Sequence, residues 1–170
     1  MLVSQRVIDL INQQIGNEFS ASLQYTAIAA HFDAEALPVL AAHFYKQSHE
    51  EREHAYKFLK YVIDVDGRVA IPAIPAPVQA FKFAEEAVAM SLEREKEVTR
   101  QINHILEVAL EERDYITQNF LQWFIQEQLE EVSSMDNLLK IVQRAGEGGL
   151  LHVEQYLARQ EEEEEEEEER

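Results

Sequence analysis

Hydrophobic residues recur along the chain with the period of long amphipathic helices. In residues 4–33, with Ser4 as the expected N-cap, apolar side chains stand three, four and seven positions apart. These apolar positions include Val7, Leu10, Ile11, Ile15, Ile28 and Phe32. A second helix is expected to carry Pro38 in its first turn and to end at Gly67. The pattern predicts an all-α protein.

A segment rich in proline interrupts this periodicity. Residues 66–79 hold one glycine and three prolines, so a continuous helix is excluded and an extended crossover is expected. The pattern then resumes. We expect a third helix over 80–109, a turn over 112–114, a fourth helix over 115–144 and a short fifth helix over 150–159.

The lengths of the connections predict the topology. Short turns make antiparallel hairpins of the first and second helices and of the third and fourth, while the long crossover lets the second and third lie parallel. We therefore predict a four-helix bundle with one long crossover and a short fifth C-terminal helix. Residues 1–160 would form one domain, followed by an acidic tail over 161–170.

Charge and composition exclude several classes of function. The tail 161–170, with nine Glu and one Arg, supplies −8 of the formal net charge of −18, so residues 1–160 carry −10. Such an acidic body repels phosphate backbones and anionic lipids, so nucleic acid and membrane surfaces are not expected partners. The absence of cysteine excludes disulfides, iron–sulfur clusters and thiolate catalysis.

The start of the chain carries no recognisable targeting signal. The segment MLVSQRVIDLINQQ lacks the basic start and continuous apolar run of a secretory signal, and no stretch approaches the ~18 apolar residues of a membrane span. We expect a cytoplasmic protein.

Four glutamates stand on the apolar stripes of the predicted helices, where residues seven apart share one face. These are Glu18 between Ile11 and Tyr25, Glu51 between Phe44 and Phe58, Glu95 between Val88 and Ile102, and Glu131 between Phe124 and Leu138. Four buried carboxylates cost several kcal/mol each unless cations neutralise them. Two divalent metals would balance the charge, and Fe(II) accepts carboxylate together with imidazole.

The spacing repeats in the two halves of the chain. Glu51 follows Glu18 by 33 residues and His54 comes three later, while Gln128 follows Glu95 by 33 and Glu131 comes three later. Single carboxylates on two helices and i, i+3 pairs on the other two match the ligand frame of di-iron carboxylate bundles. The alternative is that these are ordinary glutamates of an acidic helical protein, which would be a metal-free scaffold.

The segments NEFSASLQY, EEREH, EREKEVTRQIN and NFLQWFIQEQLEE resemble those of non-haem bacterial ferritins, over about residues 1–160. The resemblance implies a ferritin-like di-iron fold and a role in iron storage and detoxification. It also implies ferroxidase activity, in which Fe(II) is oxidised by dioxygen or peroxide and ferric mineral is deposited in a homo-oligomeric shell of 24 subunits. The fifth helices would cluster at the four-fold axes of that shell, or each would fold back on its own bundle.

The same resemblance implies particular ligands. One iron would bind Glu18, Glu51 and His54; a second would bind Glu51, Glu95 and Glu131, with Glu51 bridging and Gln128 as a weak contact. A third iron site would use Glu50, Glu127 and Glu130, which otherwise form a solvated helix face. Tyr25 would hydrogen-bond the centre or donate an electron, or would only pack in the core. Trp123 is expected to be a core residue. The other histidines, which have no obvious co-ligands, are expected to be surface or packing residues: His31, His43, His49, His104 and His152.

Differences from related families reduce the number of functions that the sequence allows. Arg52 and Glu131 stand where bacterioferritin has a haem-ligating Met and a second His, so no haem is expected. Neutral Gln128 lowers the charge at the second iron, which favours transit of iron over a fixed cofactor. A di-iron peroxidase or oxygenase with a fixed cofactor remains the alternative. The glutamate tail is expected to be disordered, or to gather iron and seed mineral inside a shell.

Overall fold

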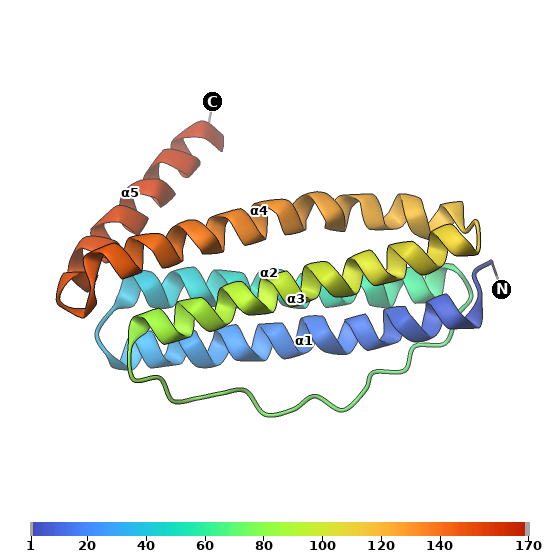
Figure 1. The fold of residues 1–170 in the computed structure, drawn as a ribbon, viewed down its shortest axis with the longest axis horizontal. Coiled ribbons are helices and arrows are strands. Elements are labelled where there is room, and N and C mark those ends of the chain that lie inside the picture. Colours follow the sequence, from blue (N-terminus) through green and yellow to red (C-terminus); the bar gives the residue numbers. More distant parts are fainter. Residues whose placement is uncertain (1, 169–170) are drawn as a thin grey trace.

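The computed structural model describes residues 2–168, and within that range it contains helices and no strand. Four long helices run along the bundle, and a fifth leaves one end at an angle (Figure 1). Their bounds are α1 Gln5–Ala34, α2 Pro38–Asp64, α3 Ala84–Glu111, α4 Tyr115–Ala145 and α5 Leu150–Glu168, with a 3₁₀ turn, η1, at Glu147–Gly149. The predicted four-helix bundle with one long crossover and a C-terminal helix is confirmed.

Tight turns close the two hairpins. Ala36 between α1 and α2, and Arg113 between α3 and α4, adopt left-handed backbone conformations with φ of 59° and 55°. Each turn is held by a backbone hydrogen bond that returns to the preceding helix, from Leu37 N–H in the first turn (2.9 Å) and from Asp114 N–H in the second (2.8 Å). These bonds satisfy carbonyl groups that the helix end leaves open.

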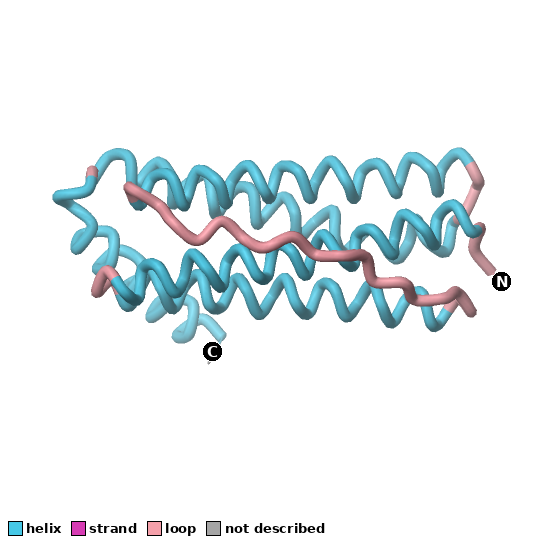
Figure 2. The backbone as a smooth tube through the Cα atoms, turned by 90° about the horizontal axis from the view of Figure 1, so that it is seen from below, coloured by secondary structure: helices cyan, strands magenta, loops and turns pink. Residues whose placement is uncertain are grey.

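The crossover between α2 and α3 lies along the bundle (Figure 2). Asn12 and Gln24 of α1 each make a pair of hydrogen bonds, 2.8–3.0 Å long, to backbone groups of this crossover. Between them Pro72 lies against Gly16, where a Cβ atom would come within 2.3 Å of the proline ring. Three residues of α1 therefore hold the crossover on the bundle surface.

Gly67 has a different role from the one predicted. Helix α2 ends at Asp64, and the left-handed residue after it is Asp66, with φ of 61°. A Cβ atom on Gly67 would lie 2.8 Å from Ile8 Cδ1 of α1 and 3.0 Å from the Val62 carbonyl oxygen. The glycine is required by the close approach of α1 rather than by its backbone angles.

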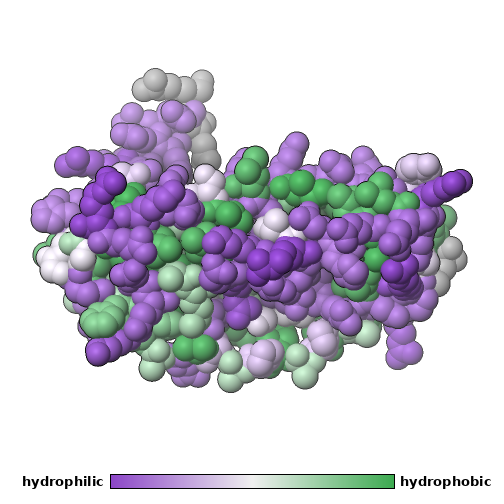
Figure 3. Space-filling view, viewed as in Figure 1, coloured by the Kyte–Doolittle hydropathy of each residue, from purple (hydrophilic) through white to green (hydrophobic). Residues whose placement is uncertain are grey.

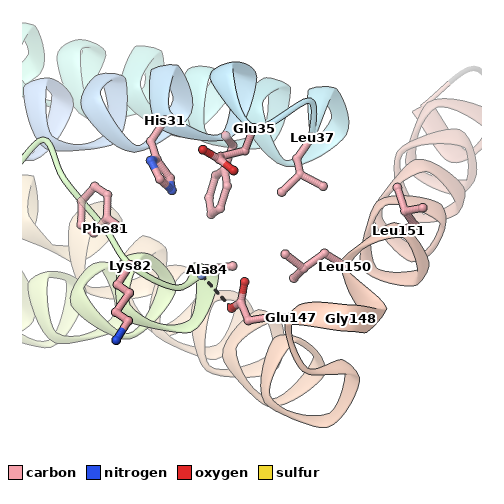
Figure 4. Close-up of a pocket in the computed structure, with 11 residues that line it drawn as sticks. His31, Glu35, Leu37, Phe81, Lys82, Ala84, Glu147, Gly148, Leu150 and Leu151 are labelled. Carbon is pink, nitrogen blue, oxygen red and sulfur yellow. Dashed lines mark hydrogen bonds between the residues drawn. The ribbon is translucent and has the colours of Figure 1, made fainter.

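The N-terminus of α3 lies at Ala84 rather than at the predicted residue 80. Its N-cap, Phe83, offers no side-chain acceptor. The Ala84 N–H instead donates to Glu147 Oε1 (2.9 Å), the contact drawn as a dashed line in Figure 4. A capping group 63 residues away in sequence cannot be found from local sequence pattern.

Helix α2 is capped in the same way. Its N-cap, Leu37, makes no side-chain bond. The buried carboxylate of Glu154 on α5 accepts the Val39 N–H (2.7 Å) and the Leu40 N–H (3.1 Å). By contrast, α1 and α4 carry their own capping side chains, Ser4 and Asp114. A carboxylate at a helix N-terminus also interacts favourably with the helix dipole, so these contacts fix the place where α5 begins.

Helix α5 is longer than the predicted helix over 150–159. Val153 and Leu157 are buried in the core of their own bundle, whereas Leu151 is 71% exposed, so the helix folds back on its own chain. Glu161–Glu168 continue it as helix, which differs from the predicted disorder. Glutamate has a high helix propensity, and extending an existing helix avoids the cost of nucleation. The rest of the predicted tail, Glu169 and Arg170, lies outside the described residues.

The apolar core is divided into two clusters. One is centred on Tyr25, Phe32 and Phe44 near the α5 end, and the other on Ile11, Phe58 and Phe124 toward the opposite end. A layer of polar side chains from all four helices separates them. That layer holds the predicted site.

The exterior is largely hydrophilic on the face drawn in Figure 3, where hydrophobic residues form only smaller patches. No helix within residues 2–168 combines the length and apolar character needed to cross a bilayer.

Replacing Glu154 tests the cap on α2. Glu154→Ala should lower the free energy of unfolding by about 1 kcal/mol, because two helical N–H groups lose their acceptor. A series of thermal melts would measure this loss. Gln155→Ala, an exposed neighbour on the same helix, is the control, and equal melting temperatures for the two variants would contradict the capping role.

Candidate metal centre

The predicted ligands meet in the polar layer at the middle of the bundle. Heptad spacing turns each of them inward, and all are buried, with Glu131 the most exposed at 8%. They are Glu18 and Tyr25 on α1, Glu51 and His54 on α2, Glu95 on α3, and Gln128 and Glu131 on α4.

The first half of the site is already assembled. Glu18, Glu51 and His54 each present a ligand atom, and these atoms all lie within 4.8 Å of one another. His54 Nδ1 is 3.4 Å from Glu51 Oε2 and 3.9 Å from Glu18 Oε2. The structure thus brings together the three residues predicted for one metal.

Several of these ligand atoms have no hydrogen-bond partner among the described residues. They are Glu18 Oε2, both carboxylate oxygens of Glu51, and His54 Nδ1, all fully shielded from solvent. Leaving a buried acceptor unpaired costs about 1–3 kcal/mol, and more when the group is charged. Oxygen and nitrogen donors in this arrangement suit a hard or borderline divalent cation such as Fe(II).

The second half of the site is closed by hydrogen bonds. Glu95 Oε1 accepts the Tyr25 hydroxyl, and Glu95 Oε2 accepts Gln128 Nε2 at 3.2 Å. Gln128 also donates to the Glu95 backbone carbonyl and to Thr99, each at 3.2 Å. Each oxygen of Glu95 keeps a second lone pair, so a metal that binds Glu95 either shares the carboxylate with these donors or displaces one of them.

Burial is the main influence on the carboxyl groups of the centre. It raises the pKa of Glu18 and of Glu51 well above the usual range, and the negative charges of Glu51 and Glu95, respectively, raise them further. Burial, followed by the charge of Glu95, raises the pKa of Glu131 to about 8. Burial and Glu95 likewise raise the pKa of the Tyr25 hydroxyl. Without a cation, the site therefore holds protons at neutral pH.

The residues predicted for a third metal lie beside the core ligands. Glu50 and Glu127 are half-buried, and Glu130 is exposed. All three are close enough to Glu131 for their charges to raise its pKa. Burial raises the pKa of Glu50 itself. They form an acidic path from Glu131 toward the surface.

Sequence reasoning missed two contacts of the centre. Gln14 is buried and donates to Glu18 Oε1 at 2.8 Å, which leaves Glu18 Oε2 facing His54. The i, i+4 spacing of Gln14 and Glu18 could have revealed this contact. Trp123, predicted to be a core residue, is instead 39% exposed. Its ring packs edge-to-face against the His54 ring, and Lys57 Nζ lies 3.1 Å from the centroid of the Trp123 ring.

A cavity of about 440 Å³ lies away from this centre, at the end of the bundle where α5 begins, between His31, Phe81 and Leu150 (Figure 4). The carboxylates instead sit in a packed interior. The site is thus suited to ions rather than to an organic substrate.

A four-helix bundle that gathers carboxylates and an imidazole at its centre defines the class of di-metal carboxylate proteins. The sequence model described as a ferritin-like domain matches residues 8–145. This chain therefore belongs to the ferritin family. Its family and fold support a role in iron storage, and the buried group of Glu18, Glu51 and His54 fits a metal site.

Individual proteins show the same relationship. The chain is 45% identical to ferritin BfrB of Mycolicibacterium smegmatis, over 89% of this chain and 83% of that protein. It is 34% identical to the bacterial non-heme ferritin of Staphylococcus aureus, over 86% and 88%. Among solved structures, the open pore ferritin of Archaeoglobus fulgidus aligns with a TM-score of 0.88 at 30% identity, covering 92% of this chain and 96% of that one.

The protons held by the centre predict how metal binding depends on pH. Each ligand must lose its proton to bind, so Co(II) binding at pH 7 should release protons, and affinity should weaken as the pH falls from 8 to 6. Calorimetry in two buffers of different ionisation enthalpy measures this release. Glu131→Gln, which has no titrating carboxyl at that position, should release fewer protons, and binding without proton release would contradict the raised pKa values.

Proposed function

We propose that this protein stores iron and is itself a ferroxidase, which oxidises Fe(II) at the buried centre and passes Fe(III) on to a mineral. The observation that carries the proposal is the set of unpaired, solvent-shielded ligand atoms on Glu18, Glu51 and His54. The family of the chain supports the same function. In this reaction iron is the substrate, and the protein supplies its binding site.

Glu51 is the natural bridging ligand. Both of its oxygens lack hydrogen-bond partners, so each is free to bind a different iron. We infer that one iron binds Glu18, Glu51 and His54, and that a second binds Glu51, Glu95 and Glu131. The first finds its ligands open, whereas the second shares Glu95 with the Tyr25 hydroxyl and the Gln128 amide or displaces one of them.

The charge balance explains why the product leaves. Four core carboxylates neutralise two Fe(II) ions, but two Fe(III) ions exceed that charge by two. Each iron gives up one electron. Together with two protons, the two electrons reduce dioxygen to hydrogen peroxide, or reduce hydrogen peroxide to two molecules of water. The excess positive charge then favours movement toward Glu50, Glu127 and Glu130, which we propose as a third site on the way out.

Storage also requires a container. The cavity at the α5 end of the bundle, about 440 Å³, is far too small for a mineral. We infer that the protein assembles into a closed homo-oligomeric shell, for which 24 subunits is the arrangement expected of the family. The cytoplasmic location and the absence of haem stay predictions from the sequence.

Loading with Fe(II) in air tests the function. Wild-type protein should keep hundreds of irons per shell in a soluble particle that elutes as one species on a sizing column. Glu51→Gln should lose rapid oxidation, because it removes the proposed bridge. Glu93→Gln is the matched control: Glu93 lies on α3, is exposed and pairs with Lys96.

Other results of this experiment would point to other functions. About two irons per chain with a persistent absorption spectrum would indicate a peroxidase or oxygenase with a fixed cofactor. No bound iron would indicate a scaffold.

The neutral side chain of Gln128 is proposed to help the second iron leave. Gln128→Glu would place a carboxylate beside Glu95 and raise the negative charge at that iron. We expect a normal first oxidation of about two irons per chain, followed by slower turnover in later cycles, measured by stopped-flow absorbance. Unchanged turnover in the second and later cycles would contradict this role.

A further inference from the structure

The imidazole of His54 has no hydrogen bond that fixes the orientation of its ring. Its Nδ1 atom lies 3.4 Å from Glu51 Oε2 without forming a hydrogen bond, and its Nε2 atom has no acceptor within residues 2–168. A histidine that binds metal usually donates its second ring N–H to a fixed acceptor, which sets the orientation of the ring. Other contacts must therefore orient the ring of His54.

Two aromatic rings of α4, Trp123 and Phe124, pack against this imidazole. Both stand edge-to-face with it at an interplanar angle of 80°, with centroid distances of 5.4 Å for Trp123 and 5.8 Å for Phe124. They also meet each other edge-to-face, at 4.9 Å and 87°. Edge-to-face packing is a favourable arrangement of aromatic rings. The two rings thus form an aromatic corner that holds the imidazole while its Nδ1 atom faces Glu18 and Glu51.

Each ring of the aromatic corner is itself held in place. Phe124 is 1% exposed and stacks on Phe58 with 4.1 Å between the ring centroids. Trp123 is 39% exposed, and Lys57 Nζ lies 3.1 Å from its ring centroid in a cation–π contact. Lys57 follows His54 by three residues on α2, so the two side chains lie on the same face of that helix. Helix α2 therefore carries both the imidazole and the cation that steadies the ring packed against it.

The orientation of the imidazole decides which of its atoms can reach a metal. The torsion that turns a histidine ring is broad and roughly two-fold. A half-turn of the His54 ring would place a carbon atom where Nδ1 now faces Glu18 and Glu51, and that carbon atom cannot bind iron. A ring that spends only part of its time in the competent orientation lowers the apparent affinity for the metal in proportion.

We propose that Trp123 is a positioning residue for the first iron, and that it holds the His54 ring with Nδ1 toward Glu18 and Glu51. The inference rests on the proposed function, because it takes His54 as a ligand of iron. Trp123 can be replaced without opening the apolar core, since its ring is partly exposed whereas Phe124 is buried. It is also the only tryptophan of the chain, so its fluorescence can be assigned without ambiguity.

Co(II) under anaerobic conditions is the probe, because it takes oxygen and nitrogen ligands without being oxidised by the protein. Equilibrium dialysis of the assembled full-length protein would measure the affinity of the first Co(II) bound per chain. Trp123→Leu should weaken this affinity at least about threefold, because the ring of His54 is no longer fixed before the metal binds. Trp123→Phe keeps an aromatic ring beside His54, so its affinity should lie closer to that of wild type than to that of Trp123→Leu.

Tyr115→Leu is the matched control. It removes an aromatic ring that is 72% exposed from the start of the same helix, about two helical turns before Trp123. This variant should bind Co(II) as wild type does, and thermal melts would check that each variant is folded. A loss smaller than threefold in Trp123→Leu, or an equal loss in Tyr115→Leu, would contradict the positioning role.

A double-mutant cycle with His54 separates positioning from a general loosening of the bundle. If Trp123 acts through His54, Trp123→Leu should have no further effect on Co(II) affinity once His54→Ala has removed the imidazole. A purely structural role would weaken binding equally in both backgrounds, and that result would overturn the proposal. Wild-type affinity in His54→Ala would overturn it too, because His54 would then not be a ligand.

The fluorescence of Trp123 gives a readout that is independent of affinity. The first Co(II) bound per chain should quench this fluorescence in the wild-type protein, because the ring touches a ligand of the metal. Glu51→Gln, which removes the proposed bridge, should abolish the quenching at the same Co(II) concentration. An unchanged fluorescence of the wild-type protein after the first Co(II) has bound would contradict the contact on which the inference depends.

The failure of this inference can be told apart from failure of the proposed function. Co(II) at the buried centre is the fraction lost in Glu51→Gln. If that fraction is present and Trp123→Leu binds it as wild type, Trp123 has no positioning role and the ferroxidase centre stands. If Glu51→Gln binds as wild type, the proposed function fails, whatever the Trp123 variants do.

Discussion

The burial of like charges in the middle of the bundle is the constraint on which the rest of this structure depends. Glu18, Glu51, Glu95 and Glu131 divide the apolar core into two clusters, and burial together with the neighbouring carboxylates raises the pKa of Glu18, Glu51 and Glu131. Two separate apolar clusters must therefore compensate for a central layer that opposes folding when no cation is present. The layer becomes favourable when a cation binds, because the cation neutralises the buried carboxylates.

The layer is not symmetric, although the two halves of the sequence repeat the same spacing. Around Glu51 the ligand atoms lack partners, whereas Glu95 is satisfied at both oxygens by Tyr25 and Gln128. The half around Glu51 offers unpaired ligand atoms to a cation, whereas in the other half a cation competes with the hydrogen bonds of Glu95. This difference suits a substrate that passes through better than a cofactor that stays.

The C-terminal segment joins two helix termini at one end of the bundle (Figure 1). Glu147 and Glu154 cap the two helices that lack capping residues of their own, and this anchors the start of α5. From that anchor, the helix carries the glutamate run past His43 and Gln47. The same segment thus stabilises two helix termini and brings negative charge beside Lys46 of α2.

The sequence by itself determined the helices, their order and the inward carboxylates, because helical periodicity and i, i+3 spacing are local properties of the chain. It did not reveal the caps on α2 and α3, the place of Gly67 against Ile8, or the hydrogen bonds that close Glu95. Those depend on side chains that are distant in sequence and meet only when the helices pack. Tertiary structure likewise decided that His43 lines a cavity together with Glu161 and Glu164 of the tail.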